Sequence, residues 1–201
     1  MRRQHVKRET DLQIISDWIE PQSRVLDLGC GRGVLLEHLR NTKHTYGVGV
    51  DNDPAKVQSC IKRGVSVYQG EAEQMLAEFG DHAFDWVVLS RTLQDLERPA
   101  AVMEAALRVG KHLAVGFVNH GYWKNRYTIA RTGSRLVNDV FPQTWDESTP
   151  SNPVTVAGFE AFCRKQNWKL QRVTYLRGDW KRSCRVLPNL RAGYALYAVT
   201  R

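Results

Sequence analysis

The sequence predicts a doubly wound α/β domain with a mostly parallel, seven-stranded sheet whose last strand is antiparallel. From residue 24 to residue 118, apolar runs of strand length alternate with segments of helical periodicity, which implies right-handed crossovers and a parallel sheet. After residue 166, two strand patterns follow with no helix pattern between them. These two strands are expected to pair antiparallel, because a parallel pair needs a longer crossover. A chain of 201 residues fits a single domain, residues 1–201.

The expected elements follow in short units. A lead helix over residues 9–19 has one apolar face that includes Leu12 and Ile15, and Pro21 ends it. This helix would cover either the ligand site or one end of the sheet. The expected strands are residues 24–28, 46–50, 65–69, 84–90, 112–118, 168–176 and 193–199. One further expected helix follows the glycine turn and ends near residue 40. The other expected helices cover residues 54–62, 73–79, 99–109 and 156–166.

Residues 24–33 are the stretch around which the chain is organised. A short buried strand leads into a turn with a glycine at every second position from 29 to 33, and leucines then follow at helical spacing. Glycines allow positive φ and the close approach of a ligand to the backbone, and a helix start offers free N–H groups. Strand, glycine turn and helix in this order predict a nucleotide site.

Carboxylates accompany this turn. Asp51 follows the second strand about 20 residues further on, where it is placed to accept both hydroxyls of a ribose. Its alternative role is to cap the helix that begins near Pro54. Asp53 suits that role better, because proline fits the first helical position. Asp27 lies inside an apolar strand, and burying its charge is costly unless it has a partner.

Composition narrows the class of protein. The net charge is +8 and the hydrophobic content is 42%, and no apolar run approaches the ~20 residues of a membrane span. The start of the chain lacks the apolar core of a signal peptide, and four scattered cysteines without C-x-x-C fit a reducing cytoplasm. The basic charge favours either a solvated face or an anionic partner. No recognisable nucleic-acid module accompanies it.

The glycine turn differs from a dinucleotide fingerprint, since the third glycine of G-x-G-x-x-G would fall at Val34. Asp27, Gly29, Gly31 and Gly33 instead resemble the first motif of the class I S-adenosylmethionine (SAM) methyltransferases, an acidic residue followed by G-x-G-x-G. The resemblance implies a methyltransferase-like Rossmann fold, with the turn against the methionine part of SAM or S-adenosylhomocysteine (SAH). Asp27 would meet the SAM ammonium, directly or through water.

The same resemblance extends to later loops. Glu71 matches an acidic residue that members usually carry after the third strand, although it could merely favour the next helix N-terminus. The loop from Ser90 to Leu93 would line the floor beneath the cofactor. It lacks the motifs of nucleobase methyltransferases, which argues against a nucleic-acid substrate. The candidate cofactor contacts are Asp27, Gly29, Cys30, Gly31, Gly33, Asp51, Asn52, Glu71, Ala72, Ser90 and Leu93.

Residues 119–153 form the longest stretch without clear periodicity, and they follow the fifth strand. Such a stretch is usually functional, so a lid or cap is expected here. The candidate catalytic residues are His120, Tyr122 and Tyr127, which would hold an acceptor or act as acid or base. The alternative is a packed cover whose aromatic side chains fill an apolar gap.

Several segments together resemble the MetW family of methionine biosynthesis, a branch of the same superfamily. They are residues 11–15, the glycine turn, and residues 84–94, 108–110, 119–123 and 159–163. The family is associated with homoserine O-acyltransferase, and no metal is implied. Two functions stay open: methyl transfer from SAM to a small-molecule acceptor, or a non-catalytic or regulatory SAM-binding subunit of homoserine O-acyltransferase. A nucleic-acid binder would rest on charge alone.

Overall fold

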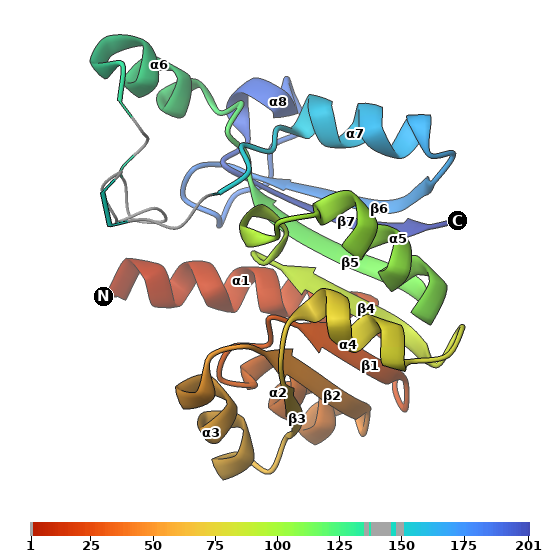
Figure 1. Cartoon of the computed structure of the whole chain (residues 1–201). Helices are drawn as coiled ribbons and strands as arrows, with labels where there is room; N and C mark the ends of the chain where they lie inside the picture. Colours follow the sequence, from red (N-terminus) through yellow and green to blue (C-terminus); the bar gives the residue numbers. More distant parts are fainter. Residues whose placement is uncertain (1, 135–136, 138–145, 148–150) are drawn as a thin grey trace.

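The computed structural model describes residues 2–134, 137, 146–147 and 151–201. One seven-stranded sheet crosses the molecule in the order β3-β2-β1-β4-β5-β7-β6 (Figure 1). The strands are β1 (Arg24–Leu28), β2 (Tyr46–Asp51), β3 (Ser66–Gln69), β4 (Phe84–Ser90), β5 (Gly110–Val118), β6 (Lys169–Leu176) and β7 (Tyr194–Thr200). Strand β7 pairs antiparallel with both β5 and β6, whereas β1 to β5 pair in parallel. The predicted fold class is confirmed.

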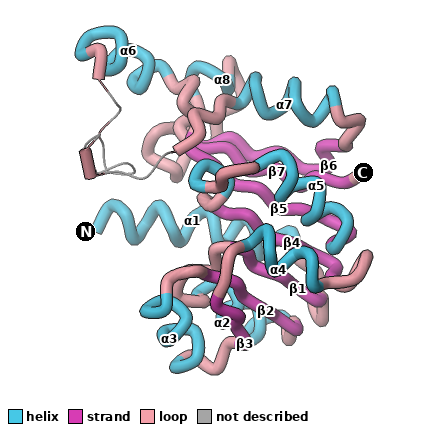
Figure 2. Tube along the Cα trace, viewed as in Figure 1, coloured by secondary structure: helices cyan, strands magenta, loops and turns pink. Residues whose placement is uncertain are grey.

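Helices cover both faces of this sheet (Figure 2). They are α1 (Arg2–Trp18), α2 (Val34–Lys43), α3 (Pro54–Lys62), α4 (Ala72–Glu78), the 3₁₀ turn η1 (Leu93–Asp95), α5 (Pro99–Val109), α6 (Trp123–Thr132), α7 (Val156–Lys165) and α8 (Pro188–Arg191). One buried apolar cluster joins α4, α5 and α7 to the sheet, and a second joins α1 and α2 to its other face. None of the helices in the described ranges is long and apolar enough to cross a membrane.

Three helices differ from the sequence-based expectation. Helix α1 begins at Arg2 instead of residue 9. The prediction missed its first half because these polar residues are helical without the apolar periodicity by which a helix is recognised in a sequence. Helix α6 was not predicted, since Asn125 is its one buried residue and no apolar stripe reveals it. The four-residue α8 was missed as well.

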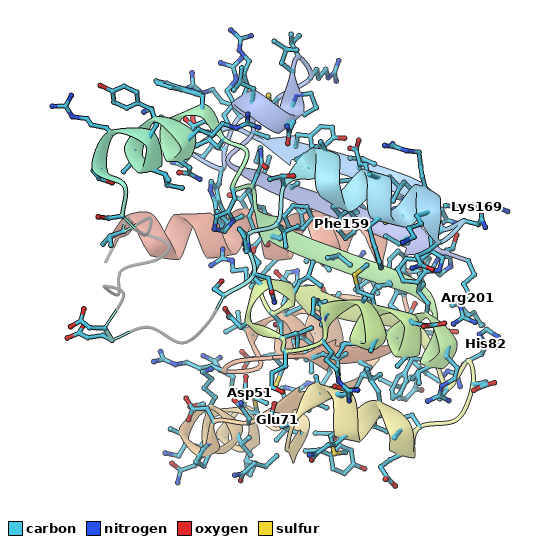
Figure 3. The ribbon with its side chains drawn as sticks, turned by 45° about the horizontal axis from the view of Figure 1, so that its top comes forward. Asp51, Glu71, His82, Phe159, Lys169 and Arg201 are labelled. Carbon is cyan, nitrogen blue, oxygen red and sulfur yellow. The ribbon has the colours of Figure 1, made fainter. Side chains whose placement is uncertain are left out.

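The strand order reverses between β1 and β4, which are parallel neighbours but lead to opposite halves of the sheet. Ligands in open α/β sheets bind at the carboxyl ends of the strands at such a point. Figure 3 shows Asp51 and Glu71 at this carboxyl edge, whereas His82, Lys169 and Arg201 lie at the opposite edge. The fold thus places Asp51 and Glu71 at the carboxyl edge, after β2 and β3, on one side of the switch point.

Candidate functional site

The glycine turn after β1 leaves bare backbone at the carboxyl edge. Gly29, Gly31 and Gly33 have φ values of 74°, 59° and 73°, which ordinary residues adopt only with strain. Gly33 is also the N-cap of α2. A methyl group built on Gly31 would meet no heavy atom within 4 Å. The turn therefore has room for a ligand directly against its backbone.

Thr92 holds this turn from the loop after β4. A methyl group on Gly29 would lie 2.2 Å from the Thr92 hydroxyl oxygen, so the two segments touch closely. The same hydroxyl donates to the carbonyl oxygen of Leu28 at 3.0 Å. From the other side, the Gly29 N–H donates to the Val50 carbonyl at 2.8 Å. The turn is thus fixed by both strands that flank β1.

Asp51 connects the end of β2 to the glycine turn. Its Oδ2 accepts the Gly31 N–H at 2.8 Å, and its Oδ1 accepts the Asp53 N–H at 3.0 Å. The Lys56 ammonium lies 3.5 Å from Oδ1. Asp53 accepts the Ala55 N–H at 2.9 Å and caps α3, as predicted. A carboxylate has about four lone-pair sites, so Asp51 retains capacity for ligand hydroxyls.

Asp27 is a buried carboxylate that has no positive partner among the described residues. Its exposed fraction is 5%, and in β1 it is paired in register with Gly49 of β2 and Val88 of β4. Burial, and then the negative charge of Asp51, raise the pKa of Asp27 to about 7. Within the described residues, none donates a hydrogen bond to this carboxylate. The place is therefore suited to a ligand cation.

Glu71 and its neighbours lie beside Asp51. The Asn52 amide donates to the Glu71 carboxylate at 3.0 Å, and both side chains are exposed. Glu71 precedes α4 and makes no capping hydrogen bond with its side chain. Ala72 begins α4 and is buried. Asn52 and Glu71 are thus brought together at the edge where the prediction placed them.

Two predicted contacts have side chains that face the core. The Cys30 sulfur lies 3.8 Å from the Cys60 sulfur, and burial raises the pKa of the Cys30 thiol. Leu93 packs in the apolar cluster with α4 and α5. For both residues the backbone is the part that remains for a ligand at the carboxyl edge.

A buried polar cluster beside the site was missed by sequence reasoning. The carboxylate of Asp11, which is 1% exposed, accepts hydrogen bonds from Arg91 at 2.9 Å and Tyr194 at 3.2 Å. The Ser90 hydroxyl also lies 3.3 Å from it. Burial raises the pKa of Asp11, and the Arg91 charge opposes that rise. The sequence carries a signal for this cluster. Asp11 stands four residues before Ile15, so a charged side chain shares the apolar face of the lead helix.

The three catalytic candidates have different surroundings. His120 follows β5, and its Nδ1 lies 3.0 Å from the Gln94 amide nitrogen. Tyr122 packs on Gly178, where an added methyl group would lie 2.6 Å from the phenol oxygen; burial raises the pKa of Tyr122. Tyr127 is 61% exposed on α6. Much of the predicted lid, residues 119–153, lies outside the described residues.

Comparison with known families identifies the family of this chain. A family model described as "Methionine biosynthesis protein MetW" matches residues 9–199. The chain belongs to the MetW family. This membership makes it a methyltransferase-like protein linked to methionine biosynthesis, as the sequence predicted.

Relatives of this MetW-family chain include a bifunctional methionine biosynthesis protein MetXA/MetW of Rhodopirellula baltica. It is 34% identical over 120 residues, which cover 56% of the chain and 19% of the relative. A ubiquinone biosynthesis O-methyltransferase of Hahella chejuensis is 37% identical over 95 residues, which cover 45% of the chain and 40% of the relative. The matched regions thus span about a fifth and two fifths of these relatives.

A solved structure with the same fold is the magnesium protoporphyrin IX methyltransferase of Synechocystis with bound SAH. Its TM-score is 0.68 at 16% sequence identity, and the match covers 98% of this chain and 84% of that one. This likeness shows the fold of the MetW-family chain. It also shows that a fold of this kind accommodates SAH in a methyltransferase.

The MetW-family site fits SAM by its own chemistry. The open backbone at Gly31 and the Asp27 carboxylate, which has no partner in the described part of the chain, match a ligand that is compact and cationic at one end. Asp51 adds an acceptor for hydroxyls. Within the described ranges, no group of three or more His, Cys, Asp or Glu side chains is placed to hold a metal ion.

Proposed function

We propose that this MetW-family chain binds SAM at the carboxyl edge, transfers its methyl group to a small-molecule acceptor and releases SAH. The observation that supports this most is the Asp27 carboxylate, buried beside the Asp51 charge and without a hydrogen bond from any described residue. A buried charge is costly unless it is paired. A cation is therefore what this place lacks, and SAM carries an ammonium and a sulfonium.

Each part of the site has a role in this proposal. Asp27 attracts the cationic end of the ligand, and the open backbone at Gly31 accommodates it. Asp51, held by the Gly31 N–H at 2.8 Å, accepts the ribose hydroxyls. Asn52 and Glu71 lie on the nucleoside side. When bound, SAM supplies an activated methyl group, so the chain itself contributes binding and orientation of the acceptor.

Thermal unfolding with and without SAM and SAH tests the binding site. Ligand at 100 times its dissociation constant stabilises by about 2.7 kcal/mol, which should raise the midpoint by about 5–10 °C for a chain of this length. Asp51→Ala should abolish this ligand-induced shift. Asp17→Ala, at an exposed position on α1, should keep it. No shift of the wild-type protein with either ligand would overturn the proposal.

A second candidate is a non-catalytic or regulatory SAM-binding subunit of homoserine O-acyltransferase. The Rhodopirellula baltica relative favours it, because its name joins MetXA and MetW in one bifunctional protein. The rate of purified homoserine O-acyltransferase should then change on addition of this chain, and the change should depend on SAM. An unchanged rate with and without SAM would exclude this second function and leave the SAM-binding test above unaffected.

A further inference from the structure

Arg91 has an unusual backbone conformation directly after β4. Its φ is 62°, in the left-handed region that residues with a Cβ atom enter only at a cost. Its N–H donates to the carbonyl oxygen of Gly116 in β5 at 2.8 Å. Strained residues of this kind persist only where the surrounding structure holds them. The groups around Arg91 should therefore explain why the chain turns here.

The side chain of Arg91 is held from two directions. Its Nε donates to Oδ2 of Asp11 in α1 at 2.9 Å. Its guanidinium carbon lies 4.7 Å from the ring centre of Trp180 and 5.9 Å from that of Tyr194, within the range of a cation–π contact. The Asp11 side chain is 1% exposed, whereas that of Arg91 is 26% exposed. A buried carboxylate and an aromatic face thus fix the guanidinium against the body of the fold.

Asp11 binds the end of β4 through other groups as well. Its Oδ2 accepts the Ser90 hydroxyl at 3.3 Å and the Tyr194 hydroxyl at 3.2 Å. Its Oδ1 accepts the N–H of Leu12 at 3.0 Å. Breaking a buried ion pair by removing one partner is strongly destabilising, because the other charge is left uncompensated. The cluster therefore ties α1 firmly to the chain at Ser90 and Arg91.

The turn at Arg91 sets the position of Thr92, the next residue. The Thr92 hydroxyl donates to the Leu28 carbonyl at 3.0 Å. It also closes on the glycine turn, because a methyl group on Gly29 would lie 2.2 Å from it. A negative φ at residue 91 would redirect the chain that follows and separate Thr92 from both groups. One continuous set of contacts thus runs from Asp11 through Arg91 and Thr92 to Gly29.

We infer that Asp11 and Arg91 are positioning residues of the SAM site: their ion pair holds the left-handed turn at residue 91, and this turn places Thr92 against the glycine turn. Neither side chain has to touch the ligand for this role. A protein whose binding-competent state is only partly populated binds its ligand more weakly by that fraction, so loss of the turn weakens SAM binding. The role at the SAM site rests on the proposed function, whereas the placement of Thr92 can be measured without a ligand.

Two substitutions of Arg91 separate its backbone from its side chain. Arg91→Ala and Arg91→Gly both remove the guanidinium, but only glycine adopts a left-handed φ without strain. Each is combined with Asp11→Asn, so that no uncompensated charge is buried. In calorimetry, the SAM dissociation constant should rise about tenfold for the alanine protein and stay within about threefold of wild type for the glycine protein. A guanidinium that merely contacted the ligand or packed in the fold would weaken both proteins equally, and equal dissociation constants would overturn the inference.

His44 provides the matched control. It also has a left-handed φ, of 53°, but it lies between α2 and β2, at the edge of the sheet opposite to the glycine turn. His44→Ala and His44→Gly should both bind SAM with the dissociation constant of wild type. A difference between these two variants as large as that at residue 91 would show that the effect reflects overall stability, and it would overturn the inference.

Asp11→Asn alone covers the case in which the double variants do not fold. It keeps the size of the side chain but replaces the ion pair with a weaker neutral hydrogen bond. The SAM dissociation constant of this variant should rise by about threefold. An unchanged dissociation constant would contradict the role of Asp11.

Urea unfolding without ligand measures the placement of Thr92. Thr92→Ala should lower the free energy of unfolding in wild type and in the Asp11→Asn/Arg91→Gly protein, because the hydrogen bond to Leu28 is lost. In the Asp11→Asn/Arg91→Ala protein, where Thr92 has already left the glycine turn, the same substitution should have little effect. Such non-additivity is the measure of coupling between neighbouring residues. The same loss in all three backgrounds would contradict control of Thr92 by residue 91.

The ligand-free experiment separates this inference from the proposed function. If wild-type protein fails to bind SAM but the unfolding data show the non-additivity, the proposed function fails and the control of Thr92 by residue 91 stands. If wild-type protein binds SAM and the alanine and glycine proteins bind it equally, only the positioning role fails.

Discussion

The proposed cofactor side of the site, residues 24–71, and its proposed acceptor side, the region after β5, are built in different ways. On the cofactor side, from residue 24 to residue 71, the key features are backbone groups and carboxylates that follow one strand at a time. On the acceptor side, side-chain amides from distant segments converge after β5. The first kind of site follows from local sequence, whereas the second exists only once the chain has folded.

Asn119 illustrates the acceptor side. It has no exposed surface, and its amide nitrogen donates to Asn189 at 3.0 Å and Ala192 at 2.8 Å. Its Oδ1 accepts the N–H groups of Gly121 at 2.9 Å and Val156 at 3.2 Å. One amide thus joins the end of β5 to the first turn of α7 and to α8. No short sequence pattern announces such a junction.

The largest effect is expected at Asp27, on the cofactor side. The pKa of Asp27 in the folded state is raised to about 7, whereas the pKa of an aspartate in the unfolded chain is about 4. The folded state therefore binds more protons between these values, and the wild-type free energy of unfolding falls as the pH rises from about 4 to about 7. Asparagine cannot ionise, so Asp27→Asn should not lose stability in this way. In urea unfolding without ligand, the free energy of unfolding of Asp27→Asn relative to wild type should rise by about 4 kcal/mol between pH 4 and pH 8.

The exposed change Asp17→Asn is the control for this pH series and should leave the wild-type profile unchanged. Parallel profiles of Asp27→Asn and wild type would show that Asp27 does not hold a proton in the folded chain. In that case Asp27 would not require a ligand cation either.

Asn119→Ala should have the next largest effect and lies on the acceptor side. It leaves several buried backbone groups without partners, so we expect a loss of about 3 kcal/mol in the free energy of unfolding. Asn125→Ala is the matched control, because its amide makes one buried hydrogen bond, to the Asn119 carbonyl. That variant should lose about 1 kcal/mol. If urea unfolding shows equal losses for Asn119→Ala and Asn125→Ala, the hydrogen bonds of Asn119 to α7 and α8 do not contribute the expected extra stability.

Gly29→Ala probes the backbone of the cofactor side. The positive φ costs roughly 1–2 kcal/mol, and the added methyl group would displace Thr92, so about 2–3 kcal/mol is expected in all. Gly31→Ala has a positive φ but open space and should cost about 1 kcal/mol. Adding Thr92→Ala to Gly29→Ala should recover part of the loss. Strictly additive losses in urea unfolding would refute the close contact.

Tyr127→Ala should have the smallest effect. Its side chain is 61% exposed on α6, so the free energy of unfolding should stay within about 0.5 kcal/mol of wild type, and the SAM-induced shift should persist. Phe159→Ala is the contrasting aromatic change, because Phe159 is buried in the core and should cost about 3–5 kcal/mol. A loss above about 1 kcal/mol for Tyr127→Ala would assign it a packing role that its exposure does not indicate.

Much of the cofactor side was predictable because its signals are local. The bounds of β1 and α3 agree with the expected ranges, since β1 is an apolar run between turn signals and α3 begins at a proline. Asp53 could be assigned as the cap of α3 from the proline beside it. The acceptor side was predictable only as a region, because α6 lacks an apolar stripe and the partners of Asn119 and His120 are remote in sequence.

The sequence alone determined the fold class, the glycine turn and the carboxylates at the carboxyl edge, because these depend on periodicities and spacings within a few residues. The tertiary structure decided that Asp27 has no partner among the described residues, that Thr92 closes on Gly29, and that Gln94 faces His120 with its NH₂ group. Each of these depends on groups from different strands. A linear pattern cannot show which donors and acceptors meet, and that meeting sets charge and proton positions in the site.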